Sequence, residues 1–294
     1  MPALPRALLH RDYGLLWGGQ TVSVVGDGIY TIAIALETLR VSDHASTLAY
    51  VQAARVAPNA LLLLFAGALV DRLPRRLVVL SADAMRAGAV ALLAALVASH
   101  AMSISGLVVL SAVVGIGDAF FYPAYRAIMP ELLPPDLLTQ GNAFNTASQT
   151  VGLSFLGPAA GGVLVAAGGT GTAFAIDAGT FVISAFCLLM MRHVPAPAPS
   201  GRSLVADARQ GIRWTMRQRW LWYGTIAAGL ANFAAFSPTA VTWPLLVRDV
   251  LHQGPAAYGA TFAAAGAAGL LAAAVAGRLG SPRRRQPGRA QRFS

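Results

Sequence analysis

The sequence contains no lysine, since all 22 of its basic residues are arginine. This absence excludes a phosphate-binding P-loop, whose lysine contacts nucleotide phosphates, and Schiff-base lysine chemistry. We therefore expect no ATP site. Charged residues are scarce as well, at 12% of the chain, whereas soluble domains average about 25%. The shortage of charge argues against an ordinary soluble enzyme and against a basic domain that binds nucleic acid.

Cysteine and histidine are equally sparse. Cys187 is the only cysteine, so no disulfide can form within the chain, and its apolar surroundings favour a packing role. The five histidines show none of the spacings of a metal site. No paired His/Asp or Ser/His set falls at a common depth. We therefore expect no metal, no cofactor and no enzymatic activity.

Apolar residues, in contrast, are abundant. They make up 56% of the 294 residues, 30 glycines come in addition, and the mean hydropathy is +0.59. A soluble protein of this composition cannot cover its surface with polar groups. The composition therefore indicates a polytopic membrane protein, whose main partner is the lipid bilayer.

Eight apolar runs are long enough to cross a bilayer as helices. A hydrocarbon core about 30 Å thick requires about 20 apolar residues in a helix. The runs are continuous, whereas transmembrane strands alternate between apolar and polar residues. We therefore predict an all-α transmembrane helical bundle with spans at 14–39, 48–70, 77–99, 102–124, 142–166, 171–191, 220–247 and 256–278.

The arginines are distributed unequally between the connections. Eighteen of them precede the first run or follow an even-numbered run, while only Arg40 and Arg248 lie in connections on the other side. Arg55 and Arg86 lie inside runs. Arginine accumulates in cytoplasmic loops of membrane proteins. The sequence thus predicts a multi-pass protein of the cell inner (plasma) membrane, with both termini in the cytoplasm.

The runs define four segments of the chain. Residues 1–191 form an expected six-helix bundle, and residues 220–278 form two further helices. Between them, residues 192–219 form a cytoplasmic linker that opens with three prolines and continues with apolar residues at helical spacing, which predicts an amphipathic helix on the inner leaflet. Residues 279–294 form a basic cytoplasmic tail.

Ionisable side chains inside a membrane are costly and are functional candidates by default. Asp27 lies near the middle of the first run, and Arg55 lies in the second. Two interpretations stay open: Asp27 carries a proton, or the two residues form a fixed structural ion pair. Asp83 and Arg86, three residues apart, are expected to pair locally. Asp118 is expected near the inner end of the fourth run, and Asp177 in the outer part of the sixth.

Two further motifs stand out. The loop between the second and third runs joins a glycine to acidic and basic residues, and we expect its glycine to let helices approach closely. The fifth run contains a proline among glycines, which predicts a bent helix with a flat contact surface. The first motif comprises Gly67, Asp71, Arg72, Arg75 and Arg76, and the second comprises Gly157, Pro158, Gly161 and Gly162.

These residues resemble a known family. The stretch from Gly67 to Arg76 resembles the loop between helices two and three of the major facilitator superfamily. The run from Phe120 to Arg126, followed by 130–135, is similar to the end of helix four in a branch that includes the enterobactin exporter and actinobacterial drug-efflux proteins. The stretch Gly157–Gly162 is similar to the helix-five motif of proton-coupled antiporters. The resemblance covers about residues 11–280.

The resemblance implies a secondary transporter with alternating access between two six-helix halves. In this superfamily, the two halves are structural repeats of each other. It implies that Asp71, Arg75 and Asp118 form a charge relay at the cytoplasmic gate, and that Asp27 couples transport to a proton or substrate. Two positions depart from the family pattern. The stretch 110–115 lacks the helix-four arginine, and Leu153 stands where the helix-five motif has glycine.

Two functions are therefore carried forward. The first is a proton-coupled exporter, or antiporter, of a small drug-like or siderophore-like molecule, with protons as the coupling ion. The second follows from the length, because a full member has twelve helices and this chain has about eight. In this alternative, the chain is a truncated membrane protein that does not transport, either an inactive fragment or an assembly or sensor subunit.

Overall fold

The computed structural model describes residues 6–192, 213 and 216–279, and this part of the chain consists of helices and the loops between them, without a strand. The all-α prediction is thereby confirmed. Most of the predicted linker with its amphipathic helix, and nearly all of the predicted tail, lie outside the described residues. The elements are α1 (Arg6–Leu9), α2 (Arg11–Val41), α3 (Ala45–Val70), α4 (Arg75–Ala98), α5 (Ile104–Leu132), η1 (Pro135–Leu137), α6 (Leu138–Val151), η2 (Gly152–Leu156), α7 (Gly157–Met190), α9 (Arg219–Leu245), η3 (Leu246–Val250) and α10 (Pro255–Leu279).

The helices follow the predicted runs closely. Four described helical segments are long and apolar enough to cross a membrane: Arg11–Val41, Arg75–Ala98, Ile104–Leu132 and Pro135–Met190. The last has 56 residues and contains two predicted runs. α3, α9 and α10 coincide with the other three. The largest difference is in α5, which continues eight residues past the predicted end at 124.

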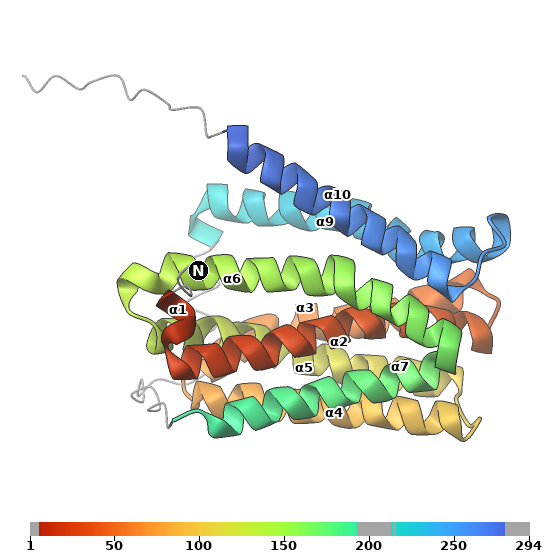
Figure 1. Ribbon diagram of the computed structural model, residues 1–294, viewed down its shortest axis with the longest axis horizontal. Helices are drawn as coiled ribbons and strands as arrows, with labels where there is room; N and C mark the ends of the chain where they lie inside the picture. Colours follow the sequence, from red (N-terminus) through yellow and green to blue (C-terminus); the bar gives the residue numbers. More distant parts are fainter. Residues whose placement is uncertain (1–5, 193–212, 214–215, 280–294) are drawn as a thin grey trace, which may run out of the picture.

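The fifth and sixth runs are separated by one glycine. Gly169 has φ 78°, a left-handed conformation that L-residues with a side chain rarely adopt. It lies between helical residues of α7 and turns the chain back toward the side from which α6 came (Figure 1). The predicted connection at 167–170 is therefore present as a single-residue break.

The fifth run is also bent in its middle, as its proline and glycines predict. η2 is a π-helical turn, and the Gly157 N–H donates to the Gly152 carbonyl five residues earlier. Pro158 has no N–H, so Ser154 loses its ordinary helical partner. The wider turn absorbs this loss before α7 begins.

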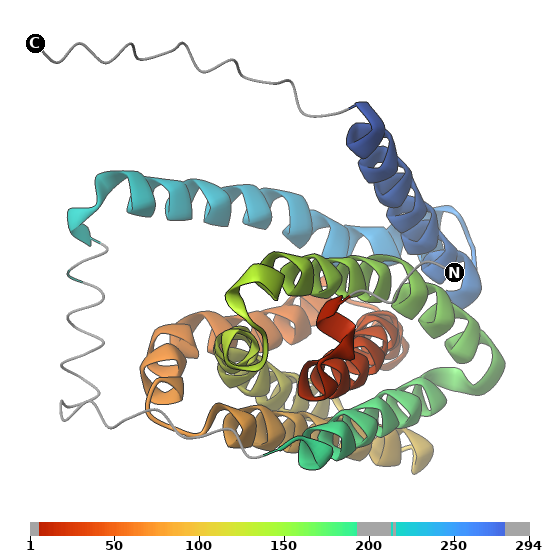
Figure 2. The ribbon, with the colours of Figure 1, turned by 60° about the vertical axis from the view of Figure 1, so that its left-hand side comes forward.

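α2 occupies the middle of the bundle, with helices from α3 to α7 around it (Figure 2). Its most apolar stretch is 72% buried, whereas the corresponding stretch of Pro135–Met190 is 33% buried. α10 packs against α7 and η2, and α9 lies further out. Asp27, the candidate residue of the first run, is therefore buried inside the bundle.

The bundle has two distinct ends. At one end, here called the arginine-rich end, Arg11 donates to the Met190 carbonyl and Arg76 donates to the Leu189 carbonyl. At the opposite end, Arg248 donates to the Leu39 carbonyl. The chain crosses between these ends with each successive run (Figure 1). Large apolar side chains cover the outer faces between the ends, as a lipid-facing surface requires. They include Leu61, Phe65, Val109, Val163, Val182 and Phe186.

Candidate functional site

Five charged side chains meet in the middle of the bundle, and we refer to them as the charged cluster. They come from four helices: Asp27 from α2, Arg55 from α3, Asp83 and Arg86 from α4, and Asp118 from α5. Asp83 and Arg86 have relative exposures of 0% and 1%. Sequence positions separated by up to 91 residues thus form one site.

Arg55 connects α3 to two other helices. Its Nε lies 3.0 Å from Asp118 Oδ2, and its Nη2 lies 3.5 Å from Asp27 Oδ1. The guanidinium carbon also lies 4.8 Å from the centre of the Tyr30 ring. The structure therefore brings together the predicted pair of Asp27 and Arg55, and adds Asp118 to it.

Arg86 is the centre of the charged cluster. It forms a short ion pair with Asp83, as expected, but its Nη1 also lies 3.3 Å from Asp118 Oδ1 and 3.6 Å from Asp27 Oδ2. The Phe121 and Phe181 rings lie on its guanidinium at 4.2 and 4.6 Å. Such contacts favour a desolvated cation. Arg86 is thus shared by three carboxylates, which the local pairing alone did not predict.

Two glycines of α5 make room for these arginines. A methyl group at Gly115 would collide with the Arg55 backbone carbonyl, and a methyl group at Gly117 would lie 2.6 Å from Arg86 Cγ. A side chain at either position would therefore displace an arginine. The cluster depends on these two close approaches.

The charge of the cluster is unbalanced. Three carboxylates face two guanidiniums, so the fully ionised cluster carries a net charge of −1. An unmatched charge is expensive in a poorly hydrated interior. The cluster is accordingly suited to take up one positive charge, either a proton or a cationic group of a ligand.

A line of polar side chains extends from the cluster toward the arginine-rich end. Gln20 Nε2 donates to Asp83 Oδ2 at 3.2 Å and to Ser184 Oγ at 2.7 Å. Ser184 Oγ in turn donates to Asp83 Oδ2 at 2.7 Å. These bonds join α2, α4 and α7 on the side of the cluster that faces the arginine-rich end. Both side-chain oxygens of Asp83 therefore have partners, since Arg86 binds Oδ1.

The loop at 71–76 lies at the arginine-rich end and stabilises helix ends. The Asp71 N–H closes α3 by donating to the Gly67 carbonyl. Arg75 donates to the Ala127 carbonyl of α5 and pairs with Glu131, while Arg76 donates to the Leu189 carbonyl of α7. Cations on these carbonyls complement the negative end of the helix dipole. Arg72 lies in the turn between α3 and α4 and also has a partner.

Two expectations for this loop differ from the structure. Asp118 does not join Asp71 and Arg75: it lies in the middle of α5, about 20 Å before the helix ends at 1.5 Å per residue. It was expected near the helix end because the apolar run stops at 124, whereas α5 continues to Leu132. Gly67 is not a close-contact position either, since no described atom lies within 4 Å of a methyl group added there.

The helix-five motif does form the predicted contact surface, on two sides. A methyl group at Gly157 would lie 2.6 Å from Gly28 Cα of α2, and one at Gly161 would lie 3.1 Å from Ile29 Cα. On the other side, a methyl group at Gly162 would lie 2.8 Å from Gly259 Cα of α10. Pro158 Cδ fills the remaining space at Gly28. The motif therefore lets α7 approach both α2 and α10 at backbone distance.

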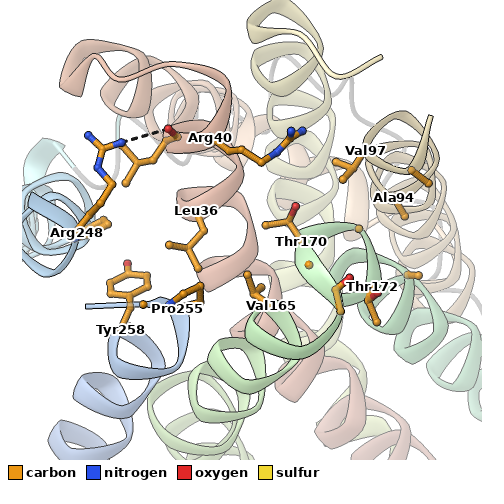
Figure 3. Close-up of a pocket in the computed structure, with 18 of the residues that line it drawn as sticks. Leu36, Arg40, Ala94, Val97, Val165, Thr170, Thr172, Arg248, Pro255 and Tyr258 are labelled. Atoms are coloured by element: carbon orange, nitrogen blue, oxygen red, sulfur yellow. Dashed lines mark hydrogen bonds between the residues drawn. The ribbon is translucent and has the colours of Figure 1, made fainter. Parts of the chain in front are cut away.

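An open cavity of about 940 Å³ lies at the opposite end, between α2, α4, α7, η3 and α10 (Figure 3). Thr170 and Tyr258 line it, together with Arg40 and Arg248. Arg248 also binds Asp249 with two hydrogen bonds, which lower the pKa of that exposed carboxyl. The walls are otherwise mainly apolar. A small amphipathic molecule fits this volume and lining.

The shared role of Arg86 and Asp118 was missed by sequence reasoning. The family pattern places an arginine on helix four, which this sequence lacks at 110–115. In the structure, Arg55 and Arg86 reach Asp118 on that helix from the two neighbouring helices. Gly117, next to Asp118, was the available signal, because a glycine beside a buried acid leaves room for a large partner.

Residues 6–286 match the family model described as transmembrane secretion effector. The chain is 23% identical to macrolide efflux protein A of Streptococcus pyogenes over 82% of the chain and 60% of that protein. It is 29% identical to the multidrug efflux pump Tap of Mycolicibacterium fortuitum over 70% of the chain and 51% of the pump.

A third relative matches over a longer stretch. The uncharacterized MFS-type transporter YfiS of Bacillus subtilis is 26% identical over 94% of the chain and 66% of its own length. The chain thus spans about 60% of the length of the first curated relative that it matches.

Proposed function

The chain belongs to the transmembrane secretion effector family of the major facilitator superfamily, and from this premise we propose that it works as a proton-coupled exporter of a small molecule. The names of two relatives, a macrolide efflux protein and a multidrug efflux pump, favour a drug-like amphipathic substrate over a simple ion or sugar. The mainly apolar cavity at the opposite end supports the same class. A siderophore-like compound is the second substrate class within this proposal.

The observation that carries the proposal is the charged cluster. Two guanidiniums shared by three carboxylates accept one further positive charge, which is the requirement for exchanging a proton against a substrate. We assign coupling to Asp27 and Arg55, because their contact joins the central helix α2 to α3. A positive charge that reaches Asp27, either a proton or a cationic group of the substrate, weakens its hold on both arginines and thereby loosens four helices from one another.

Loop 71–76 and the helix-five motif supply the moving parts in this proposal. Arg75 and Arg76 connect α4 to α5 and α7 at the arginine-rich end, where a cytoplasmic gate would open and close. The glycine contacts of α7 with α2 and α10 present smooth backbone surfaces, which allow helices to slide. In this proposal, the arginine-rich end faces the cytoplasm, the protein lies in the inner (plasma) membrane, and no ATP takes part.

The coupling assignment is tested in everted membrane vesicles that contain the full chain. Uptake of a fluorescent amphipathic cation and of a labelled macrolide is measured with and without an imposed proton gradient. In Asp27→Asn, gradient-dependent uptake is expected to fall to the level without a gradient. Asp136→Asn, a change in η1, is the control and is expected to leave uptake unchanged. Full gradient-dependent uptake by Asp27→Asn would contradict the assignment.

The alternative proposal is a membrane protein that does not transport by itself. In this alternative, the charged cluster serves as a set of fixed ion pairs that hold α2, α3, α4 and α5 together, and it exchanges no proton. The native mass of the purified chain distinguishes the two. A stable assembly that also exports the probes supports transport, whereas a folded chain that exports neither probe supports the alternative.

A further inference from the structure

A fourth carboxyl, Asp177, lies deep in the bundle next to the charged cluster. It belongs to the second half of α7 and has a relative exposure of 0%. Unlike Asp27, Asp83 and Asp118, it forms no ion pair with any arginine in the described part of the chain. Its Oδ2 is buried and has no hydrogen-bond partner there. Asp177 is therefore the acid that the two arginines leave unmatched.

The hydrogen bonds at Thr180 show which form of Asp177 fits the site. The Thr180 hydroxyl lies 2.7 Å from the Asp177 backbone carbonyl and 3.3 Å from Asp177 Oδ1. Its single hydrogen is taken by the nearer carbonyl. An ionised Asp177 would then lack a donor on both side-chain oxygens. A protonated Oδ1 instead donates to the Thr180 oxygen, and only a neutral carbonyl oxygen is left without a partner.

The backbone of α2 is shaped to admit this carboxyl. A methyl group at Gly26 would collide with both Asp177 Oδ1 and Thr180 Oγ1. Gly26 directly precedes Asp27, so Asp177 lies at the level of the charged cluster. The ionisable groups that act on it are Asp27 and Tyr30 from α2, Arg55 from α3, and Arg86 from α4.

These groups do not provide the positive charge that an ionised Asp177 would need. Arg55 and Arg86 are already engaged with three carboxylates at 3.0–3.6 Å or closer. An isolated carboxylate is strongly unfavourable in such a site, and a buried acid takes up a proton instead. Asp27 adds a like charge, which acts in the same direction.

We propose that Asp177 is protonated in this conformation and that its proton is the one exchanged during transport. The inference rests on the proposed function, and it gives Asp27 and Asp177 different roles. Asp27 stays ionised between Arg55 and Arg86 while Asp177 holds the proton. When the helices separate and water reaches Asp177, the O–H bond breaks, the proton passes to water, and the carboxylate remains.

The surrounding side chains supply a route for that proton toward the arginine-rich end. Thr180 and Ser184 follow Asp177 at helical spacing along α7, and Ser23 and Gln20 occupy α2 opposite them. Ser184 and Gln20 are hydrogen-bonded to each other. The Ser23 hydroxyl is buried without a hydrogen-bond partner among the described residues. It is thus available to a water molecule or a proton in transit.

Infrared spectroscopy of the purified full chain tests the protonation directly, without any need for transport. A protonated carboxyl has a C=O stretch that is separate from the carboxylate and amide bands and shifts in D₂O. We expect this band at neutral pH in the unmodified chain and its loss in Asp177→Asn. Asp249→Asn, an exposed position in η3, is the matched control and is expected to keep the band. Absence of the band, or its persistence in Asp177→Asn, would overturn the proposal.

Thr180→Val provides a second infrared test, in which the Asp177 carboxyl itself is retained. Loss of the hydroxyl removes the acceptor for the Asp177 proton, so the C=O stretch is expected to move to higher frequency. An unchanged frequency would show that the protonated group is not at this site.

Vesicle uptake then separates this inference from the proposed function. If the unmodified chain exports the probes and Asp177→Asn loses only the dependence on the proton gradient, the proposed function and the inference are both supported. If Asp177→Asn keeps that dependence, the exchanged proton is elsewhere and the inference fails, while the exporter remains. If the unmodified chain exports neither probe, the proposed function fails, and the infrared band decides whether Asp177 is a proton site.

Discussion

The charged cluster lies in the middle of four helices, whereas loop 71–76 lies at their ends. Both regions contain arginines and acids, yet the arginines of the two regions bind different groups. In the cluster, each arginine binds carboxylates from two or more helices and contacts aromatic rings. In the loop, Arg75 and Arg76 bind backbone carbonyls, and Arg75 adds one acid, Glu131.

The difference shows how the surroundings change the value of the same residue. Water and salt weaken the attraction between charges at a helix end, and water replaces a lost partner there. No such replacement reaches Arg86, with a relative exposure of 1%. Removal of one charged residue from the cluster therefore leaves its partners buried and unpaired. Removal of one from the loop leaves its partners in contact with water. Three substitutions make this comparison quantitative.

The largest effect is expected from Arg86→Met. The substitution leaves Asp83 without its close cation and Asp118 with Arg55 alone, and loss of one partner from a buried ion pair costs about 3–5 kcal/mol. The free energy of unfolding is measured by denaturant titration in mixed micelles. The double variant Arg86→Met with Asp83→Leu is expected to recover part of the loss. A cost below about 1 kcal/mol would place Arg86 in the same class as the loop arginines.

A smaller effect is expected from Gly117→Ala. The added methyl group would lie 2.6 Å from Arg86 Cγ, close to the backbone, so the whole arginine must move. Overpacking of this kind costs about 1–3 kcal/mol. Gly88→Ala in α4 is the matched control, because no described atom lies within 4 Å of its added methyl group. It is expected to stabilise the chain by about 0.5–1 kcal/mol. Effects of the same sign for both variants would contradict the packing explanation.

The smallest effect is expected from Arg75→Gln. The side chains of Arg75 and Glu131 have relative exposures of 21% and 27%, and partly exposed ion pairs contribute about 0–1 kcal/mol. The loss is measured by the same titration at low and at high salt and is expected to shrink as salt screens the pair. The loss for Arg86→Met is expected to be independent of salt. A salt-independent loss for Arg75→Gln would remove the distinction between the two regions.

Much of the fold was predictable because bilayer thickness fixes the length of an apolar helix. α3 ends at Val70, as predicted, and the connection at 167–170 is present around Gly169. The end of α5 was not predictable from hydropathy, since its last turns extend beyond the apolar run. The close helix contacts at the helix-five motif were predictable, because a glycine's lack of a side chain is a local property.

The site was predictable only in part. The pair of Asp83 and Arg86 was expected from their spacing, and an ion pair of Asp27 with Arg55 was one of two interpretations left open by their depth. The sharing of Arg86 among three acids was not, because it depends on how α2, α4 and α5 are rotated toward one another. Hydropathy gives the depth of a residue but not the direction in which it points. Asp177 illustrates the same limit: it was expected in the outer part of the sixth run, whereas its place beside the charged cluster and its lack of an arginine emerged only from the packing.

The charged cluster has a consequence for how the chain is made. Ribosomes add residues at roughly 5–20 per second, and Asp27 is synthesised before any of the arginines with which it pairs. At that rate, Asp27 waits about 1–6 s for Arg55 and about 3–12 s for Arg86. During biosynthesis, the first helix is therefore made before the helices that carry the partners of its acid. The ion pairs of Asp27 form only when α3 and α4 lie beside it, which makes the order of synthesis part of the assembly of the site.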